Sequence, residues 1–434
     1  MKGKTMNAIS CDKKLRKTFS MPYHIGVYLA LNAVSDACLI VDGPNCSVPK
    51  AEFIYGNHDL FSTIFSPDGA HRLLYTMARP LKQTGNPDER LSVLLRAAAD
   101  SGKFGIVLLT ALPFLKLAGT DYEGLASETS CKTPVIEIAP KSLESGWLGG
   151  YSQALDSMVR AMPPKRIKRG KNTAAVVGYM HDRNEGDHEA NIKELKRLAG
   201  FCGLNLTNIF PDGGTFEEQT GILGADIIIS FPYGRKAGRR AAGISGARLL
   251  ETDMPMGLRG TKSWMETLCR AAGTKPGEAA FAAEKDTAVK MEKAAEILLH
   301  KPAVFAGDPY LGSAFRSFAE ELGMRPDTLI IDAEYTEPAA GLQPKRLYYA
   351  PDVNETAELI RGLKGFEKPA VFVGNSFAAS ENLRGDIPFV ELGFPSYTSH
   401  CFGERPFLGF SGAADLAGRL MNSQLGSGRD RRNA

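Results

Sequence analysis

The feature that most constrains the fold of this chain is the alternation of short β-branched apolar runs with amphipathic helical stretches. Stretches typical of such helices include residues 188–203 and 312–324, the second of which closes on Gly323 in the manner of a helix C-cap. The runs that we predict to be strands are residues 37–43, 105–110, 133–139, 172–179, 225–231, 302–307, 327–333, 347–352 and 369–374. Strands that alternate with helices are typical of parallel sheets covered by helices, so we predict an α/β fold.

Two breaks in this pattern divide the chain. Residues 163–172 are proline-rich and basic and lead directly into a strand, and residues 300–303 end a long Ala/Glu/Lys-rich helix before the next strand. We therefore predict three Rossmann-like parallel-sheet α/β domains around a central cleft. Their predicted ranges are 1–164, 165–299 and 300–425, followed by a disordered tail over residues 426–434.

Composition excludes several classes of protein. The net charge is only +3, and the excess Lys and Arg concentrate in the N-terminal arm, in residues 163–171 and in the C-terminal tail. Such runs are typical of solvated linkers, so we predict no nucleic-acid partner.

The longest apolar run, residues 104–115, is interrupted by Pro113 and is shorter than the ~20 residues of a membrane span. With no apolar segment at the N-terminus to act as a signal peptide, we expect a cytoplasmic protein without membrane contact.

The motif content is also restrictive. The seven cysteines are odd in number and irregular in spacing, which argues against a disulfide framework. Neither a G-x-x-x-x-G-K-[ST] loop nor a G-x-G-x-x-G turn after a strand is present, so we expect no standard phosphate cradle for ATP or a dinucleotide.

One cysteine stands out by its position. The predicted strand ending at Asp42 runs into the sequence Gly43-Pro44-Asn45-Cys46, so a thiol lies where α/β sheets place ligands. A nucleophilic thiol would need a base, and a redox pair prefers C-x-x-C, whereas thiolate is the ligand that iron–sulfur clusters require. From these residues alone, a buried structural cysteine remains the alternative.

A wider pattern accompanies this segment. The DGPNC stretch resembles the His-Gly-x-x-x-Cys segment of the component 1 subunits of nitrogenase and of the dark-operative chlorophyll-biosynthesis reductases. Segments similar to other motifs of that family follow in its order, at residues 21–31, 109–125, 133–155, 250–268, 306–324 and 391–423. The segment GFPSYTSHCFGERPFLGF (393–410) has the spacing of the β-type subunits.

The resemblance implies a particular metal site. The family's β subunit gives three cysteines to an iron–sulfur cluster at a subunit interface. In this chain the first position falls on Met21, the second on Cys46 and the third on Ala111 or Pro113. A thioether is a poor ligand for such iron and alanine or proline is none. We therefore expect a 4Fe-4S cluster that Cys46 shares with a cysteine-richer α-type partner subunit, rather than an eight-iron cluster.

Three more residues are candidates for cofactor binding through the same resemblance. Ser145 is placed like a family hydroxyl near the cluster, with a helix cap as its alternative. Asp42 replaces the family's histidine and could instead shape the turn, and His24 could instead be a surface or helix-start residue. We expect Cys38 to be part of the core and His400 and Cys401 to be structural.

The resemblance implies that this chain is one subunit of a component 1-like reductase. A separate ATP-hydrolysing iron protein would supply electrons, and a small-molecule substrate would be reduced in the complex. Two alternatives remain open: a cofactor-assembly scaffold of the same fold, and a non-catalytic binding protein that has lost the cluster.

Overall fold

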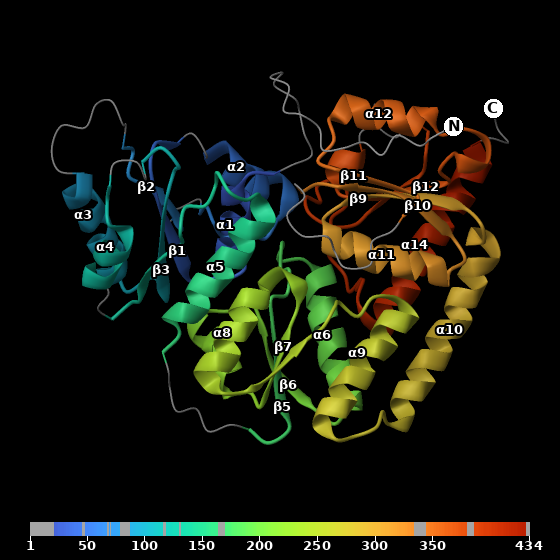
Figure 1. Cartoon of the computed structure of the whole chain (residues 1–434), viewed down its shortest axis with the longest axis horizontal. Helices are drawn as coiled ribbons and strands as arrows, with labels where there is room; N and C mark the ends of the chain where they lie inside the picture. Colours follow the sequence, from blue (N-terminus) through green and yellow to red (C-terminus); the bar gives the residue numbers. More distant parts are fainter. Residues whose placement is uncertain are drawn as a thin grey trace.

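A computed structural model of the chain describes residues 21–45, 48–66, 69, 71–78, 87–115, 119–129, 132–163, 170–333, 344–379 and 386–430. Within these ranges the strands form three separate parallel sheets, each flanked by helices (Figure 1). The predicted α/β class with three parallel-sheet domains is confirmed. The predicted ligand Cys46 lies outside the described residues.

The first sheet has the strand order β2-β1-β3-β4. Its strands are β1 (Ala37–Asp42), β2 (Leu73–Tyr75), β3 (Ile106–Ala111) and β4 (Val135–Glu137). Its helices are α1 (Tyr23–Asn32), α2 (Val48–Phe53), the π-helix η2 (Ile54–His58), α3 (Pro87–Asp100), α4 (Tyr122–Thr129) and α5 (Trp147–Ala161). The central strands β1 and β3 are buried at every position, which explains their continuous apolar runs.

The second sheet has the order β6-β5-β7-β8. Its strands are β5 (Thr173–Val177), β6 (Asn205–Phe210), β7 (Ile227–Ser230) and β8 (Arg248–Glu251). Its helices are α6 (Gly186–Phe201), α7 (Phe216–Gln219), α8 (Arg235–Ser245), α9 (Gly257–Ala272) and α10 (Glu278–Leu298), with 3-10 turns η4 (Thr220–Gly224) and η5 (Pro232–Gly234).

The third sheet has the order β11-β10-β9-β12-β13. Its strands are β9 (Pro302–Gly307), β10 (Arg325–Ile331), β11 (Arg346–Tyr349), β12 (Val371–Gly374) and β13 (Phe389–Glu391). The helices after β9 are α11 (Pro309–Glu321), α12 (Val353–Gly362) and α14 (Gly409–Asp430), with 3-10 turns η6 (Gly365–Glu367) and η7 (Ser376–Ala379). Gly323 follows α11 with φ +68°, as the predicted C-cap requires.

The sequence predictions of the elements compare closely with this fold. Every predicted strand forms, and each sheet lies within one of the three predicted ranges, whose boundaries stay predictions. Four strands that we did not predict also form: β2, β6, β8 and β13. The tail differs from the prediction, since α14 continues to Asp430, so residues 426–430 are helical rather than disordered.

The last helix returns to the middle of the molecule. The helix α14 packs against α10, α9 and α6 of the second domain as well as against β12 and β13 (Figure 1). Its start is held by Asn191 of α6, whose Oδ1 accepts hydrogen bonds from the backbone N–H groups of Phe407 at 2.9 Å and Leu408 at 3.0 Å. The helix therefore joins the second domain to the third.

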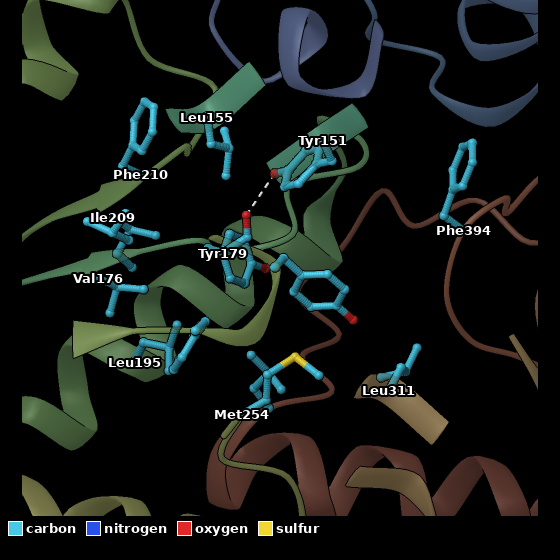
Figure 2. Packing of buried hydrophobic residues seen from close by; sticks show 14 of the residues in the cluster. Tyr151, Leu155, Val176, Tyr179, Leu195, Ile209, Phe210, Met254, Leu311 and Phe394 are labelled. Carbon is cyan, nitrogen blue, oxygen red and sulfur yellow. Dashed lines mark hydrogen bonds between the residues drawn. The ribbon is translucent and has the colours of Figure 1, made fainter. Parts of the chain in front are cut away.

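One hydrophobic core runs through all three domains. Figure 2 shows members of this cluster from the third domain (Leu311 and Phe394), from the second (Met254 and Tyr179) and from α5 (Tyr151). The Tyr151 hydroxyl donates a 2.7 Å hydrogen bond to the carbonyl oxygen of Tyr179. No helix in the described part of the chain is both long and apolar enough to cross a membrane.

Candidate functional site

The carboxyl edge of the first sheet brings together several positions that the sequence singled out. The strand order reverses between β1 and β3, and such a reversal opens a crevice at the carboxyl ends of the strands. Asp42 ends β1 and Ala111 ends β3, and the two are direct neighbours in the sheet. Leu112 N–H donates to the Asp42 carbonyl oxygen at 3.0 Å, which ties the two strand ends together.

The N-termini of α1 and α5 lie at the same edge. Trp147 N–H donates to the carbonyl oxygen of Met21 at 3.1 Å, and Pro22 forms a β-bridge with Gly146. A Cβ on Gly26 of α1 would overlap the Trp147 carbonyl oxygen, so glycine is required for this close crossing. Met21 and the start of α5 are thus fixed relative to each other.

Asp42 is bound on both carboxylate oxygens. Thr76 Oγ1 donates to one oxygen at 2.5 Å and the Tyr122 hydroxyl to the other at 2.7 Å. Gly43 N–H donates to Thr76 Oγ1 at 2.9 Å, and Gly43 has φ +149°, which favours glycine. Burial and the Asp42 carboxylate raise the pKa of Tyr122 well above its usual value, so Tyr122 stays a donor. These contacts hold the turn that leads towards Cys46.

His24 lies inside the protein rather than on its surface. It is 6% exposed, and its Nε2 is 3.4 Å from the carbonyl oxygen of Ala111, one of the positions of the family's third cysteine. Burial lowers the pKa of His24, so the imidazole is neutral at neutral pH. The imidazole is enclosed by the rings of Tyr23 and Tyr28 on the same helix.

Ser145 lies one residue before the N-cap of α5. The helix begins at Trp147 with Gly146 as its N-cap and with no side-chain cap hydrogen bond, so the alternative role of Ser145 as a helix cap is wrong. Its hydroxyl lies close to the place of a Cβ on Gly149, over the first turn of the helix. Ser145 is partly exposed, beside the bridge between Gly146 and Pro22.

The described residues at this edge do not form a complete metal site. Met21 is only 9% exposed and belongs to the hydrophobic core, and Ala111 is fully buried. Cys38 is also fully buried among apolar side chains, and burial raises the pKa of its thiol to about 12, which confirms the prediction of a core residue. Across the described ranges, no group of three His, Cys, Asp or Glu side chains could hold a metal ion.

Large apolar side chains are exposed along the same edge. They follow the ends of β2, β3 and β4: Met77 is 50% exposed, Phe114 40% and Leu143 86%. Met77 has φ +60°, a strained conformation for a side chain with a Cβ. Because the carboxyl ends of parallel strands lie at one edge of a sheet, the segments that carry these side chains leave the sheet at the edge where Asp42 and Ala111 end their strands.

A second constellation, which the sequence did not lead us to predict, lies where the three domains meet. Ser396 N–H of the third domain donates to Nδ1 of His58 at 2.9 Å, and Nε2 of His58 is 3.0 Å from the carbonyl oxygen of Asp182 in the second. Asp182 Oδ1 is 2.7 Å from Nε2 of His188, whose Nδ1 is 2.8 Å from the Tyr179 hydroxyl. Burial alone would lower the pKa of His188, but the carboxylates of Asp182 and Asp187 raise it above its ordinary value.

The junction continues to the C-terminal segment. The buried carboxylate of Glu185 lies 2.7 Å from Nδ1 of His400 and accepts a 2.7 Å hydrogen bond from the backbone N–H of Cys401. Arg183 pairs with Asp187 at 2.5 Å and donates to the carbonyl oxygen of Ser399 at 3.0 Å. These contacts fit the structural role that we predicted for His400 and Cys401.

Side chains fill most of the space at this junction. A cavity of about 40 Å³ remains between the second and third domains, bordered by Asp182, His188, Glu391 and Arg419. That volume has room for about one water molecule. The sequence signal was the segment YMHDRNEGDHE (179–189), which places seven acidic or basic side chains between the end of β5 and the first turn of α6.

Comparisons with known proteins agree with this architecture. The family model "Nitrogenase component 1 type Oxidoreductase" matches residues 22–425. The solved structure "Nitrogenase Cp1 at pH 6.5" superposes with a TM-score of 0.81 at 16% identity, over 96% of this chain and 95% of that one. This structural likeness shows the fold.

Three curated relatives are similar in sequence. The nitrogenase molybdenum-iron protein beta chain of Frankia alni is 27% identical over 187 residues, 41% of this chain and 34% of its own length. The beta chain of Methanothermobacter thermautotrophicus is 24% identical over 326 residues, 68% of each chain. A light-independent protochlorophyllide reductase subunit of Chlorobium luteolum is 24% identical over 304 residues, 63% of this chain and 56% of its own.

The chain thus matches between about a third and two-thirds of the length of these relatives. The family model, in contrast, covers nearly all of the chain, from Pro22 to residue 425. On this match the chain belongs to the nitrogenase component 1 type oxidoreductases.

Proposed function

We propose that this chain is the β-type subunit of a nitrogenase-like component 1 reductase. A cysteine-richer α-type subunit meets it at the carboxyl edge of the first sheet, and the two share a 4Fe-4S cluster. A separate ATP-hydrolysing iron protein delivers electrons to the complex, which acts on a small-molecule substrate in the cytoplasm. When bound, such a cluster supplies one-electron transfer at a potential set by its surroundings.

One observation carries this proposal. The positions that match the family's cysteine segments, which are far apart in the sequence, converge at the carboxyl edge of the first sheet: Met21 precedes α1, and Ala111 ends β3 beside His24 of α1. Asp42 ends the neighbouring strand, and Cys46 follows it by four residues in the sequence. This convergence supports a ligand edge at these strand ends, although most of the thiols are replaced.

The described residues do not fit a cluster held by this chain alone. Met21 offers a thioether packed in the core, and Ala111 offers no ligand atom. In the proposal Cys46 is the one thiolate from this chain, and the partner supplies the others. Asp42 fixes the turn before Cys46 through Thr76 and Tyr122, and His24 and Ser145 complete the protein wall of the site.

The exposed apolar side chains support a partner at this edge. Met77, Phe114 and Leu143 are large and exposed, and each follows a strand of the first sheet. A subunit that docks here would cover them and would bring its own ligands to the crevice.

Iron content tests the ligand assignment. We expect the complex purified anaerobically with its partner to contain iron, and Cys46→Ala to lose most of it, because the one thiolate that we propose as a ligand from this chain is removed. Cys269→Ala is the matched control: Cys269 is a buried cysteine of α9, and its loss should leave iron unchanged. Unchanged iron in Cys46→Ala would remove Cys46 as a ligand.

Two other functions stay in competition. The core packing of Met21 and the absence of a ligand atom at Ala111 favour a binding protein that has lost its cluster, and wild-type complex without iron would support it. A scaffold for cofactor assembly would instead carry a maturing metallocluster and show no turnover.

A further inference from the structure

A separate groove lies between the second and third domains. It has a volume of about 620 Å³ and is bordered by the carboxyl ends of β7 and β8 and by the helices α9 and α11. Ligands of α/β proteins bind beyond the carboxyl ends of strands and at domain interfaces. None of the described residues of the proposed cluster site, Met21, His24, Asp42 and Ser145, borders this groove.

The walls of the groove are two helix faces with the same spacing. From α9 and α11 the bordering residues are Gly260, Ser263, Trp264 and Thr267, and Tyr310, Ser313, Ala314 and Ser317. Residues at i, i+3, i+4 and i+7 lie on one face of a helix. Two packed helices usually fill such faces with large apolar side chains, whereas here each face carries one aromatic residue among small and hydroxyl-bearing ones. The helices therefore leave a space between them that is lined with hydroxyl groups.

The serine hydroxyls on the two helix faces of the groove are available to bind a ligand. Within the described residues, the side chains of Ser263, Ser313 and Ser317 make no hydrogen bond, and each is exposed or partly exposed. A serine hydroxyl can donate one hydrogen bond and accept two. Three such groups on facing helices can bind several polar groups of one ligand.

The charges at the groove do not favour an anion. Arg235 lies 3.7 Å from the carboxylate of Asp253 and donates to the carbonyl oxygen of Thr252 at 2.8 Å. The carboxylate of Glu321 accepts from the first N–H groups of α9, at 2.7 Å from Leu258 N, so this helix N-terminus is already occupied. An added anion would face the carboxylate of Asp253 and an Arg235 guanidinium that is already paired, so neutral hydroxyl groups would have to bind it.

A metal cation and a purely apolar ligand fit no better. No group of three metal-ligating side chains occurs in the part of the chain that the structure describes, and the Arg235 guanidinium repels cations. An apolar ligand would cover the serine hydroxyls without replacing their hydrogen bonds to water. The groove opens to solvent at Asp253, whose side chain is 96% exposed, so a polar ligand has a path of entry.

We propose that this groove binds a neutral polyhydroxylated small molecule, a sugar or a polyol. Its hydroxyl groups bond with Ser263, Ser313 and Ser317, and the partly exposed ring of Tyr310 packs against its C–H groups. The groove is independent of the cluster site, so this binding requires no iron.

Calorimetric titration and saturation-transfer NMR test the proposal with the full-length protein. The probes are D-glucose, D-ribose and myo-inositol: saturable binding of either of the first two indicates a sugar, and binding of the third alone indicates a polyol. We expect the double variant Ser263→Ala with Ser313→Ala to weaken binding about tenfold, because two hydrogen-bonding groups are lost while the groove keeps its shape. Ser263→Leu with Ser313→Leu fills the groove and should abolish binding.

Two controls separate this result from other effects. Ser127→Leu, at an exposed position on α4 that does not border the groove, should bind as the wild type does. Cys46→Ala should also bind as the wild type does, because the proposed binding requires no iron. The proposal is overturned if none of the three probes binds saturably, or if the alanine double variant binds unchanged. Both results leave the iron assay of Cys46 unaffected, so the two proposals fail separately.

Discussion

Among the described glycines of the first domain, Gly26 leaves the least space for a Cβ atom. The crossing of α1 over α5 brings its Cα against the Trp147 carbonyl, and a Cβ there would overlap backbone atoms that cannot rotate away. We expect Gly26→Ala to lower the free energy of unfolding by about 3 kcal/mol, because the two helices must separate. Urea unfolding followed by circular dichroism measures this change.

Gly200 is the matched control for that substitution. It also lies in a helix, α6, but a Cβ there would meet nothing within 4 Å. Gly200→Ala should therefore raise the free energy of unfolding by roughly 0.5–1 kcal/mol, through the better helix propensity of alanine. Equal effects at the two glycines would contradict the close crossing.

His181 makes stability depend on pH. It is fully buried, burial and then the neighbouring His188 lower its pKa to about 4, and its Nδ1 has no hydrogen-bond partner among the described residues. The unfolded chain binds the proton more readily, so the stability from neutral His181 is complete above about pH 6.5 and is lost as the pH falls towards 4. The loss amounts to at most about 3 kcal/mol.

The measurement compares urea unfolding of the wild type and His181→Gln between pH 7.5 and 5. Glutamine keeps a donor for Asn184 Oδ1, which lies 3.1 Å from His181 Nε2, but it does not titrate. We expect the variant to lose less stability than the wild type over this range. Parallel curves would show that other groups carry the acid sensitivity.

The sequence patterns predicted where single residues lie in the fold better than they predicted which residues contact one another. The end of β1 and the core location of Cys38 followed from strand patterns. The partners of Asp42 did not, since Thr76 and Tyr122 are 34 and 80 residues away in the sequence. The junction of His58, Asp182 and His188 was missed because its members look scattered until the domains pack.

Among the helices, α9 depends on a cap from another domain. Glu321 of α11 accepts hydrogen bonds from Leu258 N–H at 2.7 Å and Arg259 N–H at 3.1 Å. We expect Glu321→Ala to lower the free energy of unfolding by about 1 kcal/mol, because the first N–H groups of α9 lose their side-chain acceptor. Glu320→Ala is the control, as Glu320 is exposed and pairs only with Arg316 along the same helix. Equal thermal shifts for the two variants would rule out the cap.

The strands that sequence reasoning missed share a place in their sheets. β2, β6, β8 and β13 are all edge strands. β6 and β8 contain exposed polar positions, and β2 and β13 have three residues each. Central strands such as β1 are buried on both faces and therefore carry the continuous apolar runs that a sequence search detects. An edge strand is held by hydrogen bonds to one neighbouring strand, and the sequence of the edge strand does not show which segment lies beside it.

For the whole molecule, the shared core and the returning helix predict cooperative unfolding. We expect one unfolding transition for the three domains, since one hydrophobic cluster spans them. Deleting residues 409–434, which contain α14, should expose α9 and α10 and make the second domain exchange its amide hydrogens faster. Hydrogen exchange with mass spectrometry measures this, and unchanged protection of α10 would contradict the coupling.

The return of α14 also has a consequence for biosynthesis. The ribosome completes α9 and α10 more than a hundred residues before it adds the helix that covers them. Until translation ends, the nascent chain carries an open apolar surface on its middle domain, the kind of surface to which chaperones bind. A stalled or prematurely terminated message would leave that surface permanently uncovered.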